Sequence, residues 1–135
     1  MKLTDIHSRE TEIRDIEHLE TLLTETPGID GYEAFVISGT MGEPELWVQF
    51  SGDVAYLHYF PTTDGSHPGF QPMSKDKPVH NTTPDMAIFL QVGGVWADRI
   101  EMPRETTLTR ARAITAAKEF LESQNLPGCI SWFEL

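Results

Sequence analysis

The chain has 135 residues and a mass of 15.2 kDa, a size that fits one domain burying about 70% of its extended surface without disulfides or metal ions. Apolar residues make up 39% of it, and no apolar run approaches the roughly 18 residues that a membrane span requires. This composition predicts a soluble globular protein and excludes the disordered and membrane-spanning classes.

The chain start and the cysteine content indicate a compartment. Met1 to Asp5 lacks the apolar segment of a secretory signal, and Cys129 is the single cysteine. One cysteine excludes an internal disulfide and a multi-cysteine zinc site. We therefore expect a cytoplasmic protein with no metal and no cofactor, in which Cys129 is a small packed residue rather than a nucleophile.

Negative charge is the most unusual bulk property. Asp and Glu number 21 against 10 Lys and Arg, a net charge of −11. Residues 1–45 hold 11 acids and 3 bases (−8), whereas residues 46–135 hold 10 acids and 7 bases (−3). Direct binding to phosphate backbones requires Lys and Arg, so we expect no nucleic-acid partner. An acidic surface serves solubility, or it complements a basic protein partner.

Periodicity predicts a helix and four strands in the first half. Glu12–Ile16 is expected to form a short opening strand, and Asp15 to cap a helix that stops at Pro27-Gly28. The apolar stripe of that helix is Ile16, Leu19, Leu22 and Leu23. Three strands in a meander are then expected, at Glu33–Ser38, Glu45–Phe50 and Val54–Phe60.

The second half opens with an irregular stretch, Pro61–Pro84, in which Gly69–Met73 is the one expected strand. Gly93-Gly94 is expected to be the two-residue turn of a hairpin between Ala87–Val92 and Val95–Ala97. A helix is then expected from Thr107 or Thr109 to about Ser123, followed by a closing strand over Cys129–Leu135. In that helix Arg110 falls within the apolar arc, so it lies outside the buried zone or pairs with a carboxylate.

This order of elements predicts an α+β class. We expect one domain over residues 1–135, with a mostly antiparallel sheet and two main helices packed on one face.

A search for catalytic motifs is largely negative. No zinc-protease helix, phosphate-binding glycine loop or nucleophile elbow occurs in the sequence. His58 is expected to be a hydrogen-bonded sheet histidine. Asp64, Ser66 and His67 lie within one loop, but triad members normally converge from distant parts of a fold, so turn chemistry is the plainer explanation. We expect no catalytic residue and no enzymatic activity.

Several blocks of the sequence resemble a known family. The blocks are Gly52–Pro61, His67–Gln71, Gly93–Trp96 and Met102–Leu135. In this order they resemble the first-numbered immunity-protein family of bacterial polymorphic toxin systems, which is often encoded beside nucleic-acid cytidine-deaminase toxins. The chain departs from the family at Gln124–Leu126, where a Gly and a basic residue more usually precede the proline.

The resemblance implies an inhibitor rather than an enzyme. An immunity protein binds the C-terminal domain of its cognate toxin, and it needs neither nucleic acid nor membrane. The chain lacks the H-x-E and P-C-x-x-C signature of a zinc deaminase, so it is the antidote and not the toxin. We expect a monomer or weak dimer when free. Two alternatives stay open: a small hydrolase using His58 or His67, and an acidic mimic of DNA.

Acidic and aromatic residues are the expected contacts with the toxin. Carboxylates on the first helix would steer its approach, carboxylates at strand ends would be buried on binding, and an aromatic loop residue would anchor it. The expected partner-binding residues are Glu17, Glu20, Glu25, Asp53, Asp64, His67 and Phe70. For Phe70 the alternative is that the ring fills the sheet core.

Overall fold

The computed structural model describes residues 1–73 and 85–135, and within them two helices and ten strands are formed. The helices are α1 (Ile16–Glu25) and α2 (Arg110–Ser123), and short 3₁₀ turns occupy Trp96–Asp98 and Arg104–Thr106. The strands are β1 (Lys2–Thr4), β2 (Glu10–Glu12), β3 (Tyr32–Ser38), β4 (Glu45–Ser51), β5 (Val54–Phe60), β6 (Phe70–Pro72), β7 (Met86–Phe89), β8 (Ile100–Pro103), β9 (Leu108–Thr109) and β10 (Trp132–Glu134).

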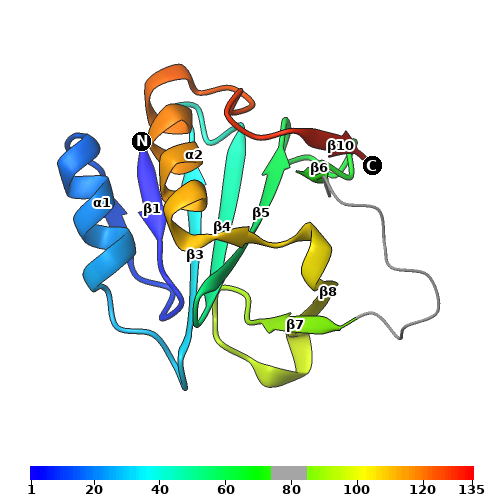
Figure 1. Cartoon of the computed structure of the whole chain (residues 1–135). Helices are drawn as coiled ribbons and strands as arrows, with labels where there is room; N and C mark the ends of the chain where they lie inside the picture. Colours follow the sequence, from blue (N-terminus) through cyan, green and yellow to red (C-terminus); the bar gives the residue numbers. More distant parts are fainter. Residues whose placement is uncertain (74–84) are drawn as a thin grey trace.

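Among the described residues, eight strands build one antiparallel sheet in the order β10-β6-β5-β4-β3-β1-β2, with β9 added beside β5. Both helices lie on one side of this sheet, while β7 and β8 form a separate hairpin near its lower end (Figure 1). The α+β class with two helices on one face is confirmed.

The central meander has the predicted pairing. Strands β3, β4 and β5 pair over their full lengths, and Ser51 opposite Val54 leaves Gly52-Asp53 as a two-residue loop. Gly52 takes a positive φ of 57°, the conformation that such a loop requires. The strands predicted at Gly69–Met73 and at the chain end are confirmed, each shorter than expected.

Helix α2 forms where its pattern predicts. The Thr109 side chain accepts a hydrogen bond from Arg112 N at 3.2 Å and caps the helix. Small side chains let the helix approach the sheet closely, and one large ring fills the remaining space. These buried residues are Ala113, Ala116, Ala117 and Phe120.

Arg110 pairs with a carboxylate, the second of the two alternatives. Its guanidinium lies 4.2 Å above the Phe50 ring, 2.6 Å from Glu33 Oε2 and 2.9 Å from Gly52 O. One side chain thus ties the first turn of α2 to β3 and to the β4–β5 loop.

The predicted N-cap of α1 is also correct: Asp15 Oδ1 accepts from His18 N at 2.8 Å.

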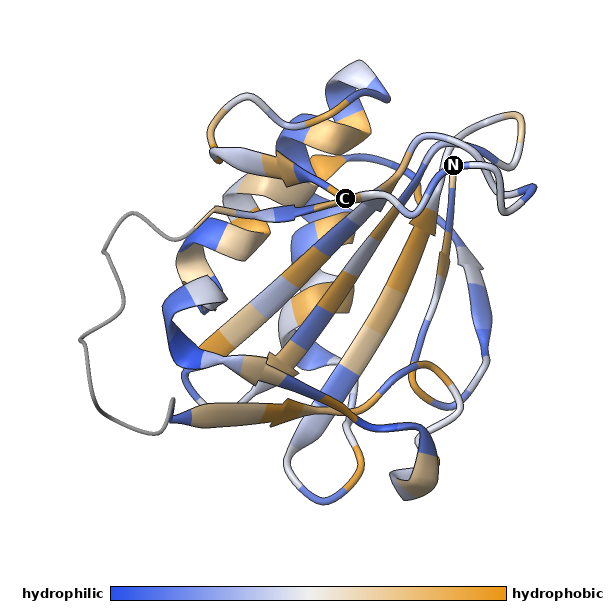
Figure 2. Ribbon diagram, turned by 90° about the vertical axis from the view of Figure 1, so that its right-hand side faces the viewer, coloured by the Kyte–Doolittle hydropathy of each residue, from blue (hydrophilic) through white to orange (hydrophobic). Residues whose placement is uncertain are grey.

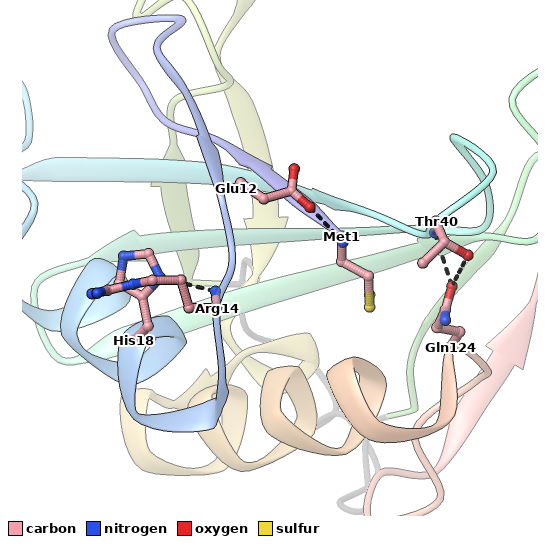
Figure 3. Close-up of polar contacts among 6 residues, drawn as sticks. All are labelled: Met1, Glu12, Arg14, His18, Thr40 and Gln124. Atoms are coloured by element: carbon pink, nitrogen blue, oxygen red, sulfur yellow. Dashed lines mark hydrogen bonds and ion pairs between the residues drawn. The ribbon is translucent and has the colours of Figure 1, made fainter.

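The opening strand, expected at Glu12–Ile16, is wrong in position. The backbone leaves the sheet after β2 because Arg14 N donates to the His18 ring, which turns the chain into the helix (Figure 3). The strand β1 was not predicted. An ion pair joins the start of the chain to β2, with the Met1 amino group 3.2 Å from Glu12 Oε1 (Figure 3).

The hairpin predicted at Gly93-Gly94 is also wrong, because its second strand begins later, at Ile100. Gly93 N donates to Ile6 O at 2.9 Å, which holds this turn on the β1–β2 connection instead of in a ladder. The following residues, Trp96–Asp98, form a 3₁₀ turn. Both glycines do have the expected positive φ.

The end of α2 is fastened to the top of the sheet. Gln124 caps the helix in the left-handed conformation, with φ of 50°. Its amide oxygen accepts from Thr40 N at 2.9 Å and from Thr40 Oγ1 at 3.1 Å (Figure 3). Gln124 therefore links the end of α2 to the β3–β4 turn.

No helix of the described residues is long and apolar enough to cross a membrane.

Truncation of Phe120 tests the packing of α2. The ring is 0% exposed and lies against Tyr59, with centroids 6.1 Å apart. We expect Phe120→Ala to lower the free energy of unfolding by about 3–5 kcal/mol, measured by urea denaturation. The exposed Glu122→Ala on the same helix is the control, expected to change it by less than about 0.5 kcal/mol. Equal stability of the two variants would contradict this placement of α2.

Candidate functional site

The structure does not bring the seven expected partner-binding residues to one surface. Glu17, Glu20 and Glu25 are exposed on α1, which lies toward the β1–β2 edge of the sheet (Figure 1). Glu20 is paired with Lys118 of α2 at 2.8 Å, so its charge is partly compensated within the protein.

The other four lie between the loop before β5 and the start of β6. Asp53 precedes β5 and Asp64 follows it, so a strand of seven residues, about 20 Å long, separates these two exposed carboxylates. Asp64 shares the β5–β6 loop with His67, and Phe70 is the first residue of β6.

Asp64 organises the loop that connects β5 to β6. Its Oδ1 accepts from Ser66 N at 2.8 Å and from Thr62 Oγ1 at 2.9 Å. The hydrogen bonds from Ser66 and Thr62 lower the pKa of Asp64, because they favour the charged carboxylate. Residues 62–66 therefore form a turn that is fixed by hydrogen bonds to Asp64. The last part of the predicted irregular stretch, residues 74–84, lies outside the described residues.

His67 has both ring nitrogens engaged. Nδ1 accepts from Gly69 N at 2.8 Å, so Nε2 carries the proton and donates to Glu134 Oε2 at 2.9 Å. The ring stacks on Phe70 with centroids 5.2 Å apart. Phe70 in turn contacts Tyr59 and packs against the main core, so its ring has neighbours within the protein before any partner binds.

His58 is a hydrogen-bonded sheet residue, as predicted. Nε2 donates to Pro68 O at 2.8 Å, and Nδ1 lies 3.3 Å from the Tyr56 hydroxyl. Burial lowers the pKa of His58, which favours the neutral ring, although the bond to Pro68 opposes this shift. Gly69 allows this contact, because a Cβ there would lie 2.4 Å from His58 Nε2.

No triad is assembled from the residues that the structure describes. Asp64 bonds to Thr62 and to the Ser66 backbone, and His67 bonds to Glu134 and Gly69, but no hydrogen bond joins Ser66 to His67. Within the same residues, no group of three His, Cys, Asp or Glu side chains is arranged to hold a metal ion.

The expectation that Cys129 is packed is wrong, because the residue is exposed. It follows the turn at Gly128, whose backbone N–H is held by Glu119 Oε1 at 2.8 Å, while Glu119 Oε2 accepts from Cys129 N at 3.2 Å. Partial desolvation of the thiol, its hydrogen bond to Glu119 and the charge of that carboxylate raise the pKa of Cys129 to about 11. The thiol is therefore protonated at neutral pH and a poor nucleophile.

The helix-free side of the sheet carries a set of half-buried side chains that sequence reasoning did not single out as a site. Val36, Trp47 and His58 are partners across β3, β4 and β5, and Phe60 is the next outward-facing residue of β5. We call these four residues the open face. Within it, ring centroids lie 5.2 Å apart for Trp47 and Phe60 and 4.3 Å apart for His58 and Phe60.

The open face lies above the part of the sheet that the β7–β8 hairpin covers. The hairpin crosses the lower ends of the long strands, and no other described helix or strand crosses the upper part on this side (Figure 2). Below, Phe89 packs on Tyr56, and Gln49 Nε2 donates to Leu90 O at 3.1 Å. The alternation of side chains in β4 and β5 indicates that an aromatic row faces away from the helices. The sequence does not indicate how much of this row the β7–β8 hairpin covers.

A small hollow adjoins the open face. It has a volume of about 170 Å³ and is lined by Glu45, Trp47, Phe60, Thr62, Thr63, Gly65 and His67. Glu43 lies beside it, since its Oε2 accepts from Thr63 N at 3.0 Å. Ion pairs in the described part of the chain engage other carboxylates, and none engages Glu43, Glu45 or Asp64.

No protein-family model matches the chain, and no curated protein matches it.

The lowered pKa of His58 predicts a pH dependence of stability. Between that pKa and the unfolded value of 6.5 the unfolded chain binds more protons, so His58 stabilises the fold above pH 6.5 and loses this contribution as the pH falls. We expect His58→Gln to flatten the fall in unfolding free energy below pH 6.5, by at most about 1.4 kcal/mol per pH unit.

Urea denaturation of the wild type and the variant from pH 8 to pH 5 measures this difference. The gap between the two proteins at pH 8 reports the hydrogen bonds that the substitution removes, and its change with pH reports the proton linkage. Parallel curves over the whole range would contradict burial of a neutral His58.

Proposed function

We propose that this protein is an immunity protein that binds and blocks a cognate polymorphic toxin domain, one that acts on nucleic acid, such as a cytidine deaminase. The observation that carries the proposal is the open face with its adjoining carboxylates. Aromatic side chains at the centre and charge at the rim are the usual anatomy of a protein interface.

Charge supports a basic partner. A toxin that acts on nucleic acid needs a positive substrate surface, and the net charge of −11 attracts such a surface over several ångströms. Glu43, Glu45 and Asp64 take part in none of the ion pairs within residues 1–73 and 85–135, and they add negative charge beside the aromatic rings, where a partner would be desolvated. An inhibitor that presents this acidic face would cover the positive surface of the toxin that otherwise binds nucleic acid.

The hydrogen bonds of the two histidines argue against the hydrolase alternative. Each ring nitrogen of His58 and His67 already has a partner, so general-base catalysis by either residue would first have to break one of these hydrogen bonds.

Internal ion pairs argue against an acidic mimic of DNA. Several carboxylates are neutralised by the protein's own cations, among them Glu33 by Arg110 and Glu20 by Lys118. A regular array imitating phosphates would not be built with such internal pairs.

Inhibition of the toxin is the direct test. We expect the partner to be the C-terminal domain of a large secreted protein encoded by the adjacent upstream reading frame. Equimolar addition of this protein to that purified domain should abolish its activity on nucleic acid, and co-expression should restore growth of cells that produce it. Full activity at equimolar inhibitor, together with loss of growth on co-expression, would contradict the proposal.

Association kinetics test the electrostatic part separately. Charge reversal at Glu17 and Glu25, which lie outside the ion pairs of the described residues, should slow association with the toxin domain several-fold at low salt. The same variants should reduce the dependence of the on-rate on salt and leave the dissociation rate nearly unchanged. An on-rate indifferent to salt in the wild type would eliminate electrostatic steering.

A further inference from the structure

The hollow beside the open face is the size of one side chain. Sites for drug-sized molecules usually measure about 300–1,000 Å³, whereas this hollow measures about 170 Å³. Its walls are the Trp47 and Phe60 rings, inclined at 56° to each other, with the Glu45 carboxylate at one side. It therefore suits a group that offers a flat apolar surface and a positive charge together.

The Glu45 carboxylate retains capacity to accept hydrogen bonds. Oε1 lies 3.4 Å from Trp47 Nε1 and Oε2 lies 3.3 Å from Ser38 Oγ, both long contacts. An ionised carboxylate has about four lone-pair positions, and side chains of the described residues occupy two of them. A planar donor with two parallel N–H groups can use the rest.

Elsewhere in the described residues, two arginines each lie over an aromatic ring and beside a carboxylate. On the helix side, the Arg110 guanidinium lies 4.2 Å above Phe50 and 2.6 Å from Glu33. Beside the β7–β8 hairpin, the Arg99 guanidinium lies 4.8 Å above Trp96 and 3.4 Å from Glu101.

Trp47, Phe60 and Glu45 repeat the aromatic and acidic parts of that arrangement. No ion pair of the described residues supplies a cation to Glu45. A cation from outside the chain would complete the set, and charge complementarity favours one from a basic protein.

We propose that the hollow binds a single arginine side chain of the partner protein, its guanidinium packed between the Trp47 and Phe60 rings and paired with Glu45. This proposal rests on the proposed function, because it names the chemical group of the toxin surface that the open face recognises. Arginine is preferred to lysine because the guanidinium is planar, stacks on aromatic rings and pairs with a carboxylate through two donors.

A titration with a model arginine tests the hollow without the toxin. The probe is N-acetyl-arginine methylamide, compared with the lysine and citrulline analogues, and the readout is the NMR signal of the indole N–H of Trp47, assigned with Trp47→Phe. We expect a saturable shift with a dissociation constant in the millimolar range. Lysine should bind several-fold more weakly, and the uncharged citrulline should produce no saturable shift.

Glu45→Gln supplies the decisive variant, because it removes the charge and keeps the shape. It should weaken arginine binding at least about tenfold, whereas Glu122→Gln, the same charge change on the helix side, should leave binding unchanged. Equal binding of arginine and citrulline, equal binding to wild type and Glu45→Gln, or a shift confined to Trp96 or Trp132 would overturn the proposal.

The complex with the toxin domain separates this proposal from the one on which it rests. Glu45→Gln should increase the dissociation rate at least about thirtyfold with little effect on association, as for a charge buried in an interface. A toxin domain that the wild type inhibits and that Glu45→Gln holds equally well would overturn the arginine site and leave the immunity function standing. Arginine binding by a protein that inhibits no toxin would leave the hollow standing and remove the function.

Discussion

Close packing of α2 on strands β4 and β5 is the contact on which the rest of the structure depends. Ala113, Ala116 and Ala117 bring the helix backbone near the sheet, and Phe120 fills the space that small side chains leave. Because both ends of α2 are fastened, by Arg110 to Glu33 and by Gln124 to Thr40, the helix fixes the positions of the β4–β5 and β3–β4 turns. The two helices thereby cover one face of the sheet, whereas the other face stays partly open.

The second face is covered in part, and the difference between its two halves produces the candidate site. The β7–β8 hairpin packs on Tyr56 and receives a hydrogen bond from the buried Gln49, so the lower half is a second small core. The upper half keeps Trp47, His58 and Phe60 half-buried, next to carboxylates that form no ion pair with the cations the structure describes. Apolar rings at the centre of an acidic rim favour a basic protein over a nucleic acid or a buried small molecule, and this is the physical basis of the proposed function.

Side-chain alternation, turn residues and helix caps predicted the elements whose formation depends on residues close together in the sequence. The meander and α2 followed from alternation, from the two-residue loop and from the Thr109 cap. For Arg110 the sequence left two alternatives open, and the structure shows the one with a carboxylate partner. Short strands such as Lys2–Thr4 were missed because three residues carry too little pattern, and the second hairpin strand was misplaced because Gly93 bonds to the distant Ile6. The open face was not predicted as a site, since its extent depends on which half of the sheet the hairpin covers. The charge imbalance was visible in the sequence, but which carboxylates stay unpaired depends on tertiary contacts.

Hydrogen–deuterium exchange of the complex with the proposed toxin domain tests most directly whether the open face or the helical layer holds the partner. We expect binding to slow exchange in the two loops bordering the hollow, residues 39–43 and 61–67, and to leave the amides of α1 and α2 as in the free protein. Slowed exchange confined to α1, with both loops unchanged, would contradict it.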